Sequence, residues 1–260
     1  MAGGTVLVER DAMVATVTLS SPGRMNALDK TMWAQLGAAM RDLGADDSLR
    51  CIVLRGADDK AFAAGADIAE FHTERANSKQ AKAYSQGGIG WLHSVAECRH
   101  PTVALIQGAC VGGGLLVASQ CDLRICNESA RFGVPVKNLG LTESYDELRG
   151  MMRIIGPAAS LEILLEGRIW GAREACEKRL VSRVVADAEV VKEAYATARR
   201  IADGAPLVAR WHKKFIRRLL DPRPVTDEER DEGYACFDTE DFRTGVAAFL
   251  AKKKPEFKGR

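Results

Sequence analysis

The sequence predicts an α/β fold in which a largely parallel sheet is followed by a helical C-terminal part. Short apolar runs with strand character alternate along the chain with segments of helical periodicity, which favours parallel strands joined by crossover helices. From about Ala188 onward no segment has a convincing strand pattern. We therefore predict an α/β core over residues 1–195 and a helical region over residues 196–260.

The predicted strands are runs rich in Val, Ile, Leu and Thr. They cover Thr5–Arg10 and Met13–Ser20, paired around Asp11, and then Arg50–Gly56, Pro101–Ile106 and Asp122–Cys126. Asp29 is the expected N-cap of the first helix, because its side chain can accept from the free amides that follow. Further helices are predicted over Gln80–Cys98, Gly113–Gln120, Pro157–Glu166, Glu189–Ala202, Pro206–Leu220, Asp227–Phe237 and Asp241–Lys253.

Composition and charge exclude several classes of protein. The 260 residues are 47% hydrophobic with a net charge of +2, so no overall field attracts nucleic acid or an acidic membrane. The cysteines show no zinc-ligand spacing, which indicates reduced, buried thiols in a cytosolic protein. No signal peptide and no membrane-length apolar run is present, so we expect a cytoplasmic protein without a membrane partner.

One basic cluster, Arg210–Arg218, interrupts this balanced composition. Trp211, Phe215 and Leu219 fall at helical spacing and form one apolar stripe. The pattern predicts an amphipathic helix with a solvated basic face. RNA binding is the alternative, and a titration with RNA at low salt tests it.

The stretch "ACVGGGLLVAS" (109–119) joins a predicted strand to a predicted helix through adjacent glycines. It matches neither the dinucleotide fingerprint nor the phosphate-binding loop with its lysine. Free amides at a helix start, aided by the helix dipole, favour negative charge, as an oxyanion hole requires. Close packing of a turn is the alternative explanation for the glycines.

A second stretch, "KAFAAGADIAEF" (60–71), has the same build. It also follows a predicted strand, contains one glycine and places Asp67 as an N-cap. Two such turns could supply one amide each to a single oxygen atom.

Both stretches resemble signatures of the crotonase, or enoyl-CoA hydratase/isomerase, superfamily. "SPGRMNALD" (21–29), "KAFAAGADI" (60–68) and "QGACVGGG" (107–114) match its three signatures. The segments "CDLRI", "ARFGVP", "NLGL" and "FRTGVAAFLAKKKPEFKGR" extend the likeness over nearly the whole chain with the spacings kept.

The resemblance implies a spiral of βα turns with a helical C-terminal trimerisation region, assembled as a homotrimer or a dimer of trimers. It implies an acyl-CoA substrate, with coenzyme A present only as part of that substrate and with no metal or redox cofactor. The amides of Ala66 and Gly113 would polarise the thioester carbonyl and hold its enolate. The residues expected to bind the substrate and its CoA are Arg24, Met25, Ala27, Lys60, Ala64, Ala66, Asp67, Ile68, Gly112, Leu116, Val136 and Lys254.

The sequence departs from the hydratases of this superfamily at both catalytic glutamates. The first follows the oxyanion glycine by three residues, where this chain has Leu116, and the second follows the F-G-x-P stretch, where it has Val136. An aliphatic side chain cannot take or give a proton, so the two-glutamate addition of water is not available from these positions.

The loop after "NLGL" supplies other candidates for the proton carrier. Some isomerases of the superfamily have one catalytic glutamate within about one position of Glu143, and burial beside Leu116 and Val136 would raise its pKa. We rank Glu143 first, then Asp146 and Tyr145, with Glu147 last. N-capping of a helix is the alternative role for Glu143, and a solvated helix turn is the alternative for Glu147.

The remaining departures are smaller. His93 lies on the predicted helix before Pro101, where a packing role competes with a place in the acyl pocket. Arg179 stands in a helix-to-strand turn where the superfamily usually has glycine, which puts the cap of that helix in question.

These observations lead to an acyl-CoA enzyme that stabilises a thioester enolate, with single-base, isomerase-like chemistry favoured over standard hydration. Thioester hydrolysis, decarboxylation and C–C cleavage stay open, since they use the same oxyanion hole with different groups around it. The alternative from another class is a catalytically silent acyl-CoA-binding or assembly protein.

Overall fold

The computed structural model describes residues 3–260, apart from the side chains of residues 86–89. Its strands are β1 Thr5–Asp11, β2 Val14–Ser20, β3 Cys51–Gly56, β4 Ala61–Ala63, β5 Thr102–Ile106, β6 Ala109–Val111, β7 Leu123–Asn127, β8 Arg131–Gly133, β9 Trp170–Gly171 and β10 Arg183–Val185. Its helices are α1 Lys30–Ala45, α2 Phe71–Glu74, α3 Ser78–Glu97, α4 Gly113–Gln120, α5 Tyr145–Glu166, α6 Ala172–Glu177, α7 Val190–Ala202, α8 Pro206–Arg218, α9 Asp227–Glu232 and α10 Glu240–Leu250. Short 3-10 turns lie at η1 Ile68–Glu70, η2 Val136–Leu139, η3 Asp187–Glu189 and η4 Ala235–Asp238.

From β3 to β8, successive strands of the chain belong alternately to two sheets. One sheet has the order β1-β2-β3-β5-β7-β10 and the other β4-β6-β8-β9. The successive strand pairs β3 and β4, β5 and β6, and β7 and β8 each place one strand in either sheet. Strand pairing is parallel except for β1 with β2 and β8 with β9. This is the predicted spiral of βα turns.

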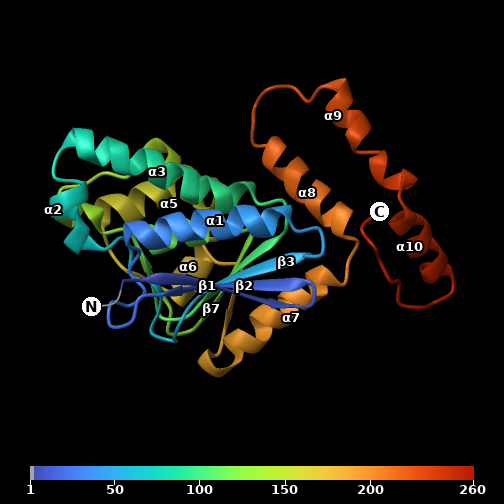
Figure 1. Ribbon diagram of the computed structural model, residues 1–260, viewed down its shortest axis with the longest axis horizontal. Coiled ribbons are helices and arrows are strands. Elements are labelled where there is room, and N and C mark those ends of the chain that lie inside the picture. The colour runs from blue at the N-terminus through green and yellow to red at the C-terminus, as the bar shows by residue number, and fades with distance from the viewer. Residues whose placement is uncertain (1–2) are drawn as a thin grey trace.

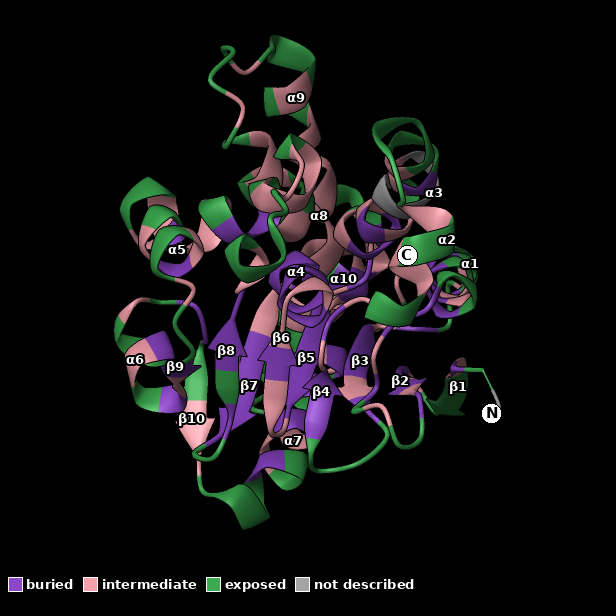
Figure 2. Ribbon diagram, turned by 90° about the vertical axis from the view of Figure 1, so that its left-hand side faces the viewer, coloured by how far each residue is buried: buried purple, intermediate pink, exposed green. Residues whose placement is uncertain are grey.

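The central strands of the larger sheet, β3 and β5, are buried on both faces, which explains their continuous apolar sequences. In β3 the side chains of Ile52 and Leu54 join the core under α1 and α3, whereas Cys51 and Val53 join a second core under α7. Figure 1 shows α1 and α3 on one side of this sheet and α7 on the other. The strands at the centre of the molecule are accordingly mostly buried (Figure 2).

Helix α7 is the last element of the α/β core. Its Ala194, Ala198 and Ala202 are buried against the sheet, so the helix belongs to the α/β core along its whole length. The predicted boundary between residues 195 and 196 falls inside this helix. The chain leaves the core after Ala202, and α8, α9 and α10 extend to one side of it (Figure 1).

The prediction that the basic face of the 210–218 helix is solvated is wrong for Lys213 and Arg217. The Lys213 side chain is only 8% exposed, and its Nζ lies 2.7 Å from a carboxylate oxygen of Asp122. Arg217 pairs with the same carboxylate at 2.8 Å, while Leu219 at the stripe's end is 64% exposed. The helix therefore docks on the core through ion pairs, because the half-buried Asp122, just before β7, offers a counter-charge.

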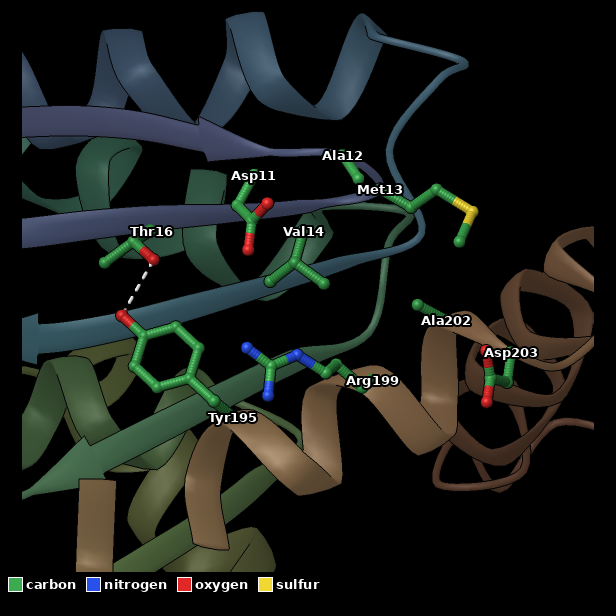
Figure 3. A pocket seen from close by; sticks show the side chains of 9 residues that line it. All are labelled: Asp11, Ala12, Met13, Val14, Thr16, Tyr195, Arg199, Ala202 and Asp203. Carbon is green, nitrogen blue, oxygen red and sulfur yellow. Dashed lines mark hydrogen bonds between the residues drawn. The ribbon is translucent and has the colours of Figure 1, made fainter. Parts of the chain in front are cut away.

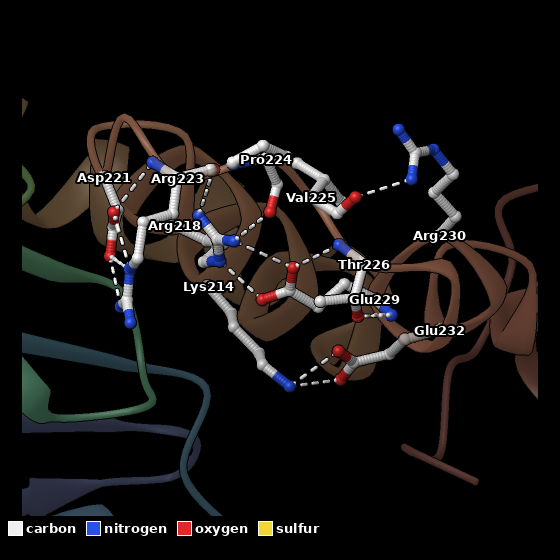
Figure 4. Close-up of polar contacts among 10 residues, drawn as sticks. All are labelled: Lys214, Arg218, Asp221, Arg223, Pro224, Val225, Thr226, Glu229, Arg230 and Glu232. Carbon is white, nitrogen blue, oxygen red and sulfur yellow. Dashed lines mark hydrogen bonds and ion pairs between the residues drawn. The ribbon is translucent and has the colours of Figure 1, made fainter.

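The other side of α8 is tied to α9 by a polar network (Figure 4). Arg218 forms an ion pair with Glu229 and donates to the carbonyl of Pro224, and Lys214 pairs with Glu232 at 2.5 Å. These contacts fix the reversal of the chain between the two helices.

Several helix boundaries differ from the prediction. The helix expected over Asp227–Phe237 ends at Glu232 as α9, and the 3-10 turn η4 follows it. The helix expected over Pro157–Glu166 begins at Tyr145 and is kinked at Gly156, whose φ is +70°. Pro157 can start a helical segment but cannot continue the hydrogen-bond ladder, so the two segments meet there. Arg179 adopts a φ of +64°, so its backbone has the left-handed conformation that glycine takes without strain.

Across residues 3–260 no helix combines the length and the apolar character needed to cross a membrane.

Candidate active site

A cavity of about 460 Å³ lies where the two predicted glycine turns meet the loop after η2. The turns contribute Gly65, Ala66, Gly112 and Gly113, and the loop contributes residues 141–144. Helices α3 and α4 and the aromatic rings of Trp33 and Phe71 complete its walls. The cavity thus brings together segments that are far apart in the sequence.

The backbone of the first turn points the Ala66 amide away from its neighbouring strand. Leu28 forms an isolated parallel bridge with Ala66, in which the Leu28 amide donates to Gly65 O at 2.8 Å and the Asp67 amide donates to Leu28 O at 2.9 Å. In a parallel ladder the bridged residue's own N–H faces the opposite side. In the described part of the chain the Ala66 amide donates to no backbone group, so it is free to face the cavity.

The second turn places the Gly113 amide beside the first. Gly112 takes a φ of +50° and donates to Gly133 O at 2.8 Å, and α4 begins at Gly113, whose N–H has no partner within the helix. A β-carbon on Gly113 would lie 3.4 Å from the Ala66 nitrogen and 3.1 Å from the Trp33 ring. The two free amides therefore lie close together at the positive end of a helix, an arrangement suited to an oxyanion.

The loop at residues 21–28 packs against the first turn and holds it. Ala64 N donates to Met25 O at 3.0 Å, and Arg24 forms an ion pair with Asp67. Asp67 also accepts from the Ala69 amide, as expected of an N-cap. Met25 is 46% exposed and has a φ of +50°, so its side chain stands at the surface beside the turn.

Aliphatic side chains face the amides across the cavity. Leu116 is buried on the first turns of α4, and Val136 begins η2 and packs against the core. Both line the cavity. Neither can transfer a proton, so the chemistry must come from another side chain.

Glu143 is the carboxyl group best placed for that task. It lines the cavity, is half-buried, and is not the helix N-cap, which is Ser144. Burial and then the nearby Glu147 raise the pKa of Glu143 to about 7, while Arg75 acts in the opposite direction. The expected rise in pKa is confirmed, and a carboxyl group in this state can both take and return a proton near neutral pH.

The neighbours of Glu143 are placed differently. Tyr145 is 92% exposed, and Asp146 lies near His93 and Arg149; neither lines the cavity. Glu147 does line it, but its Oε2 accepts from Ser144 N at 2.7 Å in a capping box. The first turn of α5 turns the side chains of Tyr145 and Asp146 outward, so neither is placed to act as the proton carrier.

The remaining residues expected to bind the substrate fall into two groups. Ala64 and Ile68 line the cavity, whereas Ala27 and Lys60 do not, and Ala27 is joined to Arg24 by a backbone hydrogen bond of 3.0 Å. Lys254 lies near the C-terminus and pairs with Asp203 at 2.9 Å. The roles of Lys60 and Lys254 toward coenzyme A stay predictions.

Arg75 lines the cavity and was missed by the sequence interpretation. It is the C-cap residue of helix α2, which has four residues and is too short to show a periodic pattern in the sequence. By contrast, the capping role of Glu147 had a signal, because Ser144-x-x-Glu147 has the capping-box pattern.

A second cavity of about 330 Å³ lies between the β1–β2 turn and α7 (Figure 3). Its Thr16 and Tyr195 hydroxyl groups are hydrogen-bonded to each other at 2.9 Å. It is bordered by the C-terminal half of α7, where a helix presents carbonyl groups, and therefore offers no cluster of free amides. The first cavity is the better candidate for catalysis.

Known proteins resemble this chain over nearly its whole length. Residues 9–260 match the family model described as enoyl-CoA hydratase/isomerase. A "Probable enoyl-CoA hydratase" of Rhizobium meliloti is 37% identical, and a "Short-chain-enoyl-CoA hydratase" of Clostridium acetobutylicum is 30% identical, each alignment covering 98% of both chains. The crystal structure of an "enoyl-CoA hydratase/ carnithine racemase" from Magnetospirillum magneticum superimposes with a TM-score of 0.97 at 51% identity, covering 98% of this chain and 96% of that one. The chain belongs to the enoyl-CoA hydratase/isomerase family and has its crotonase fold.

Proposed function

We propose that this acyl-CoA enzyme moves the double bond of an enoyl-CoA thioester through an enolate, with Glu143 as the single proton carrier. The observation that supports this most strongly is the position of Glu143. Its carboxyl group lines the same cavity as the free amides of Ala66 and Gly113, and its pKa is about 7. The aliphatic residues Leu116 and Val136 leave it without a second free carboxylate among the described cavity residues.

The proposed reaction needs one base and one anion site. Ala66 and Gly113 donate their amides to the thioester oxygen, and the Glu143 carboxylate removes a proton from the carbon next to the thioester. The electron pair of that C–H bond moves onto the thioester oxygen, giving an enolate that the two amides hold. Glu143 then returns the proton two carbons further along, and the double bond shifts toward the thioester. No metal or redox group is required by this sequence of steps.

Addition of water to the double bond needs a second acid–base group in addition to Glu143. A water molecule must be activated and a second proton delivered, commonly by two acid–base groups. Glu147 is engaged by the Ser144 amide at 2.7 Å, which ties it to the start of α5. The relatives named as hydratases leave hydration open for this chain, so the two reactions must be compared directly.

The test compares isomerisation of a 3-enoyl-CoA with hydration of crotonyl-CoA by the purified protein. Glu143→Gln should slow isomerisation by about 10²- to 10⁴-fold, since it keeps the shape of the side chain and removes the base. Glu128→Gln is the matched control, because Glu128 is exposed and outside the cavity. Efficient hydration of crotonyl-CoA that survives Glu143→Gln would contradict the proposal.

We also propose that the chain assembles through its helical C-terminal part as a homotrimer or a dimer of trimers. Support comes from large apolar side chains that stay exposed on α8 to α10, among them Ile216, Leu219, Phe249 and Leu250. Exposed apolar patches of this kind usually mark an interface. Light scattering coupled to size-exclusion chromatography should give three or six times the chain mass, and a monomer would contradict this.

A further inference from the structure

Arg75 brings a positive charge into the cavity without a matching negative partner. Its Nε atom is buried and has no hydrogen-bond partner, and no ion pair in the described part of the chain includes its guanidinium. Buried donors are nearly always satisfied in native proteins, so an unpaired one calls for an explanation. A ligand that fills the cavity could supply the missing acceptor.

Aromatic rings hold the guanidinium in place. Its central carbon lies 4.0 Å from the centroid of the Tyr84 ring and 4.7 Å from that of the Phe71 ring. Tyr84 in turn packs edge-on against Trp91, with ring centroids 6.3 Å apart. The Tyr84 side chain also hydrogen-bonds with Arg75. None of these contacts provides a carboxylate, so the remaining donors of the planar fork stay available for an anionic acceptor.

The position of Arg75 relative to the proposed chemistry decides what it would meet. Arg75 is near enough to Glu143 to lower the pKa of that carboxyl group. Ala66, Gly113, Glu143 and Arg75 all line one cavity. In the proposed reaction the thioester oxygen lies at the two amides and the carbon next to the thioester lies at Glu143, so an acyl chain that extends beyond that carbon would approach Arg75. The acceptor that reaches Arg75 therefore belongs to the acyl group.

We propose that Arg75 binds a carboxylate at the far end of the acyl chain, so that the substrate is a coenzyme A thioester of a dicarboxylic acid. A guanidinium fork matches a carboxylate in a bidentate fashion, which an aliphatic chain end cannot use. This inference rests on the proposed function, because it assumes that an acyl-CoA occupies the cavity.

The experiment measures dissociation constants by isothermal titration calorimetry for glutaryl-CoA, pentanoyl-CoA and free coenzyme A. Glutaryl-CoA and pentanoyl-CoA differ at the chain end, which is a carboxylate in one and a methyl group in the other. The wild-type protein should bind glutaryl-CoA roughly 10- to 100-fold more tightly than pentanoyl-CoA. Arg75→Gln should remove this preference while leaving pentanoyl-CoA binding intact, and Arg75→Lys should restore part of it.

Arg173→Gln is the matched control, because the Arg173 side chain is 94% exposed and pairs with Glu177 on the same helix. It should keep the full preference for glutaryl-CoA. Equal binding of glutaryl-CoA and pentanoyl-CoA by the wild-type protein would overturn the inference and leave the proposed function intact.

Two further outcomes are also decisive. If Arg75→Gln weakens free coenzyme A as much as glutaryl-CoA, the acceptor is a phosphate of the cofactor moiety and the inference is wrong. If neither thioester binds the wild-type protein, the proposed function itself fails. The melting temperature of each variant is measured alongside the titrations. If Arg75→Gln melts like the wild type but no longer binds pentanoyl-CoA, Arg75 has a general packing role in the cavity and the inference is overturned.

Discussion

The two sides of the active-site cavity are built in different ways. The oxyanion side consists of backbone amides on two glycine turns that are fixed by hydrogen bonds and packed against buried α4. The proton-transfer side is one side chain, Glu143, on a loop whose neighbours Leu139 and Leu141 are 53% and 36% exposed. Charge stabilisation therefore depends on the fold itself, whereas proton transfer depends on a replaceable side chain.

Disrupting the glycine turns of the oxyanion side should have the largest effect on stability and turnover. A β-carbon at Gly114 would overlap the carbonyl group of Ala63, which is backbone and cannot rotate away. Gly114→Ala should therefore lower the free energy of unfolding by about 3 kcal/mol or more and abolish turnover. Chemical denaturation followed by circular dichroism measures the loss.

Gly90→Ala is the control for this substitution. A β-carbon at Gly90 on α3 would meet no described atom within 4 Å, so this change should be neutral or stabilise the helix by up to about 1 kcal/mol. Equal destabilisation by the two substitutions would show that the close contact at Gly114 is not what limits the turn.

Removing the carboxyl group should instead stabilise the protein at high pH. The pKa of Glu143 is raised in the folded state to about 7, so the unfolded chain releases this proton at lower pH and stability falls between about pH 4.5 and 7. Glu143→Gln should match the wild type near pH 4.5 and exceed it by about 1–3 kcal/mol above pH 7. Denaturant melts across this range measure the difference, and a pH-independent difference would mean that the carboxyl group is not buried as described.

A smaller effect should follow from changing the surroundings of Glu143. The Arg75 guanidinium lowers the pKa of Glu143, so Arg75→Gln should raise that pKa further. Because the base is active when deprotonated, the rise of kcat/KM with pH, centred near 7 in the wild type, should move upward by up to about one pH unit. A 3-enoyl-CoA with an uncharged acyl chain is used as the substrate, so that loss of a carboxylate contact does not obscure the shift. An unchanged profile would separate Arg75 from the proton carrier.

The fold could be predicted from the sequence wherever an element was long enough to show a pattern. The predicted strands agree with β1, β2, β3, β5 and β7 to within one or two residues, and Gly113–Gln120 is α4. The strands of the second sheet are two or three residues long, too short for an alternation to appear. Their pairing is set by the spiral, which only the resemblance implied.

The site could be predicted in its backbone half and only partly in its side chains. Glycines and N-caps are local signals, so the turns of Ala66 and Gly113 were found from the sequence. The direction of the loop side chains depends on where α5 begins, which separates Glu143 from the exposed Tyr145. Arg75 depends on the packing of α2 against Tyr84 and has no local signal at all.

Exchange of the proton next to the thioester tests the cooperation of both sides most directly. Butyryl-CoA is incubated with the protein in heavy water, and deuterium at that carbon is followed by mass spectrometry, with Glu128→Gln as the control. The wild type and the control should exchange this proton, and Glu143→Gln should slow the exchange about 10²- to 10⁴-fold. Exchange by Glu143→Gln at the wild-type rate would contradict the assignment of Glu143 as the proton carrier.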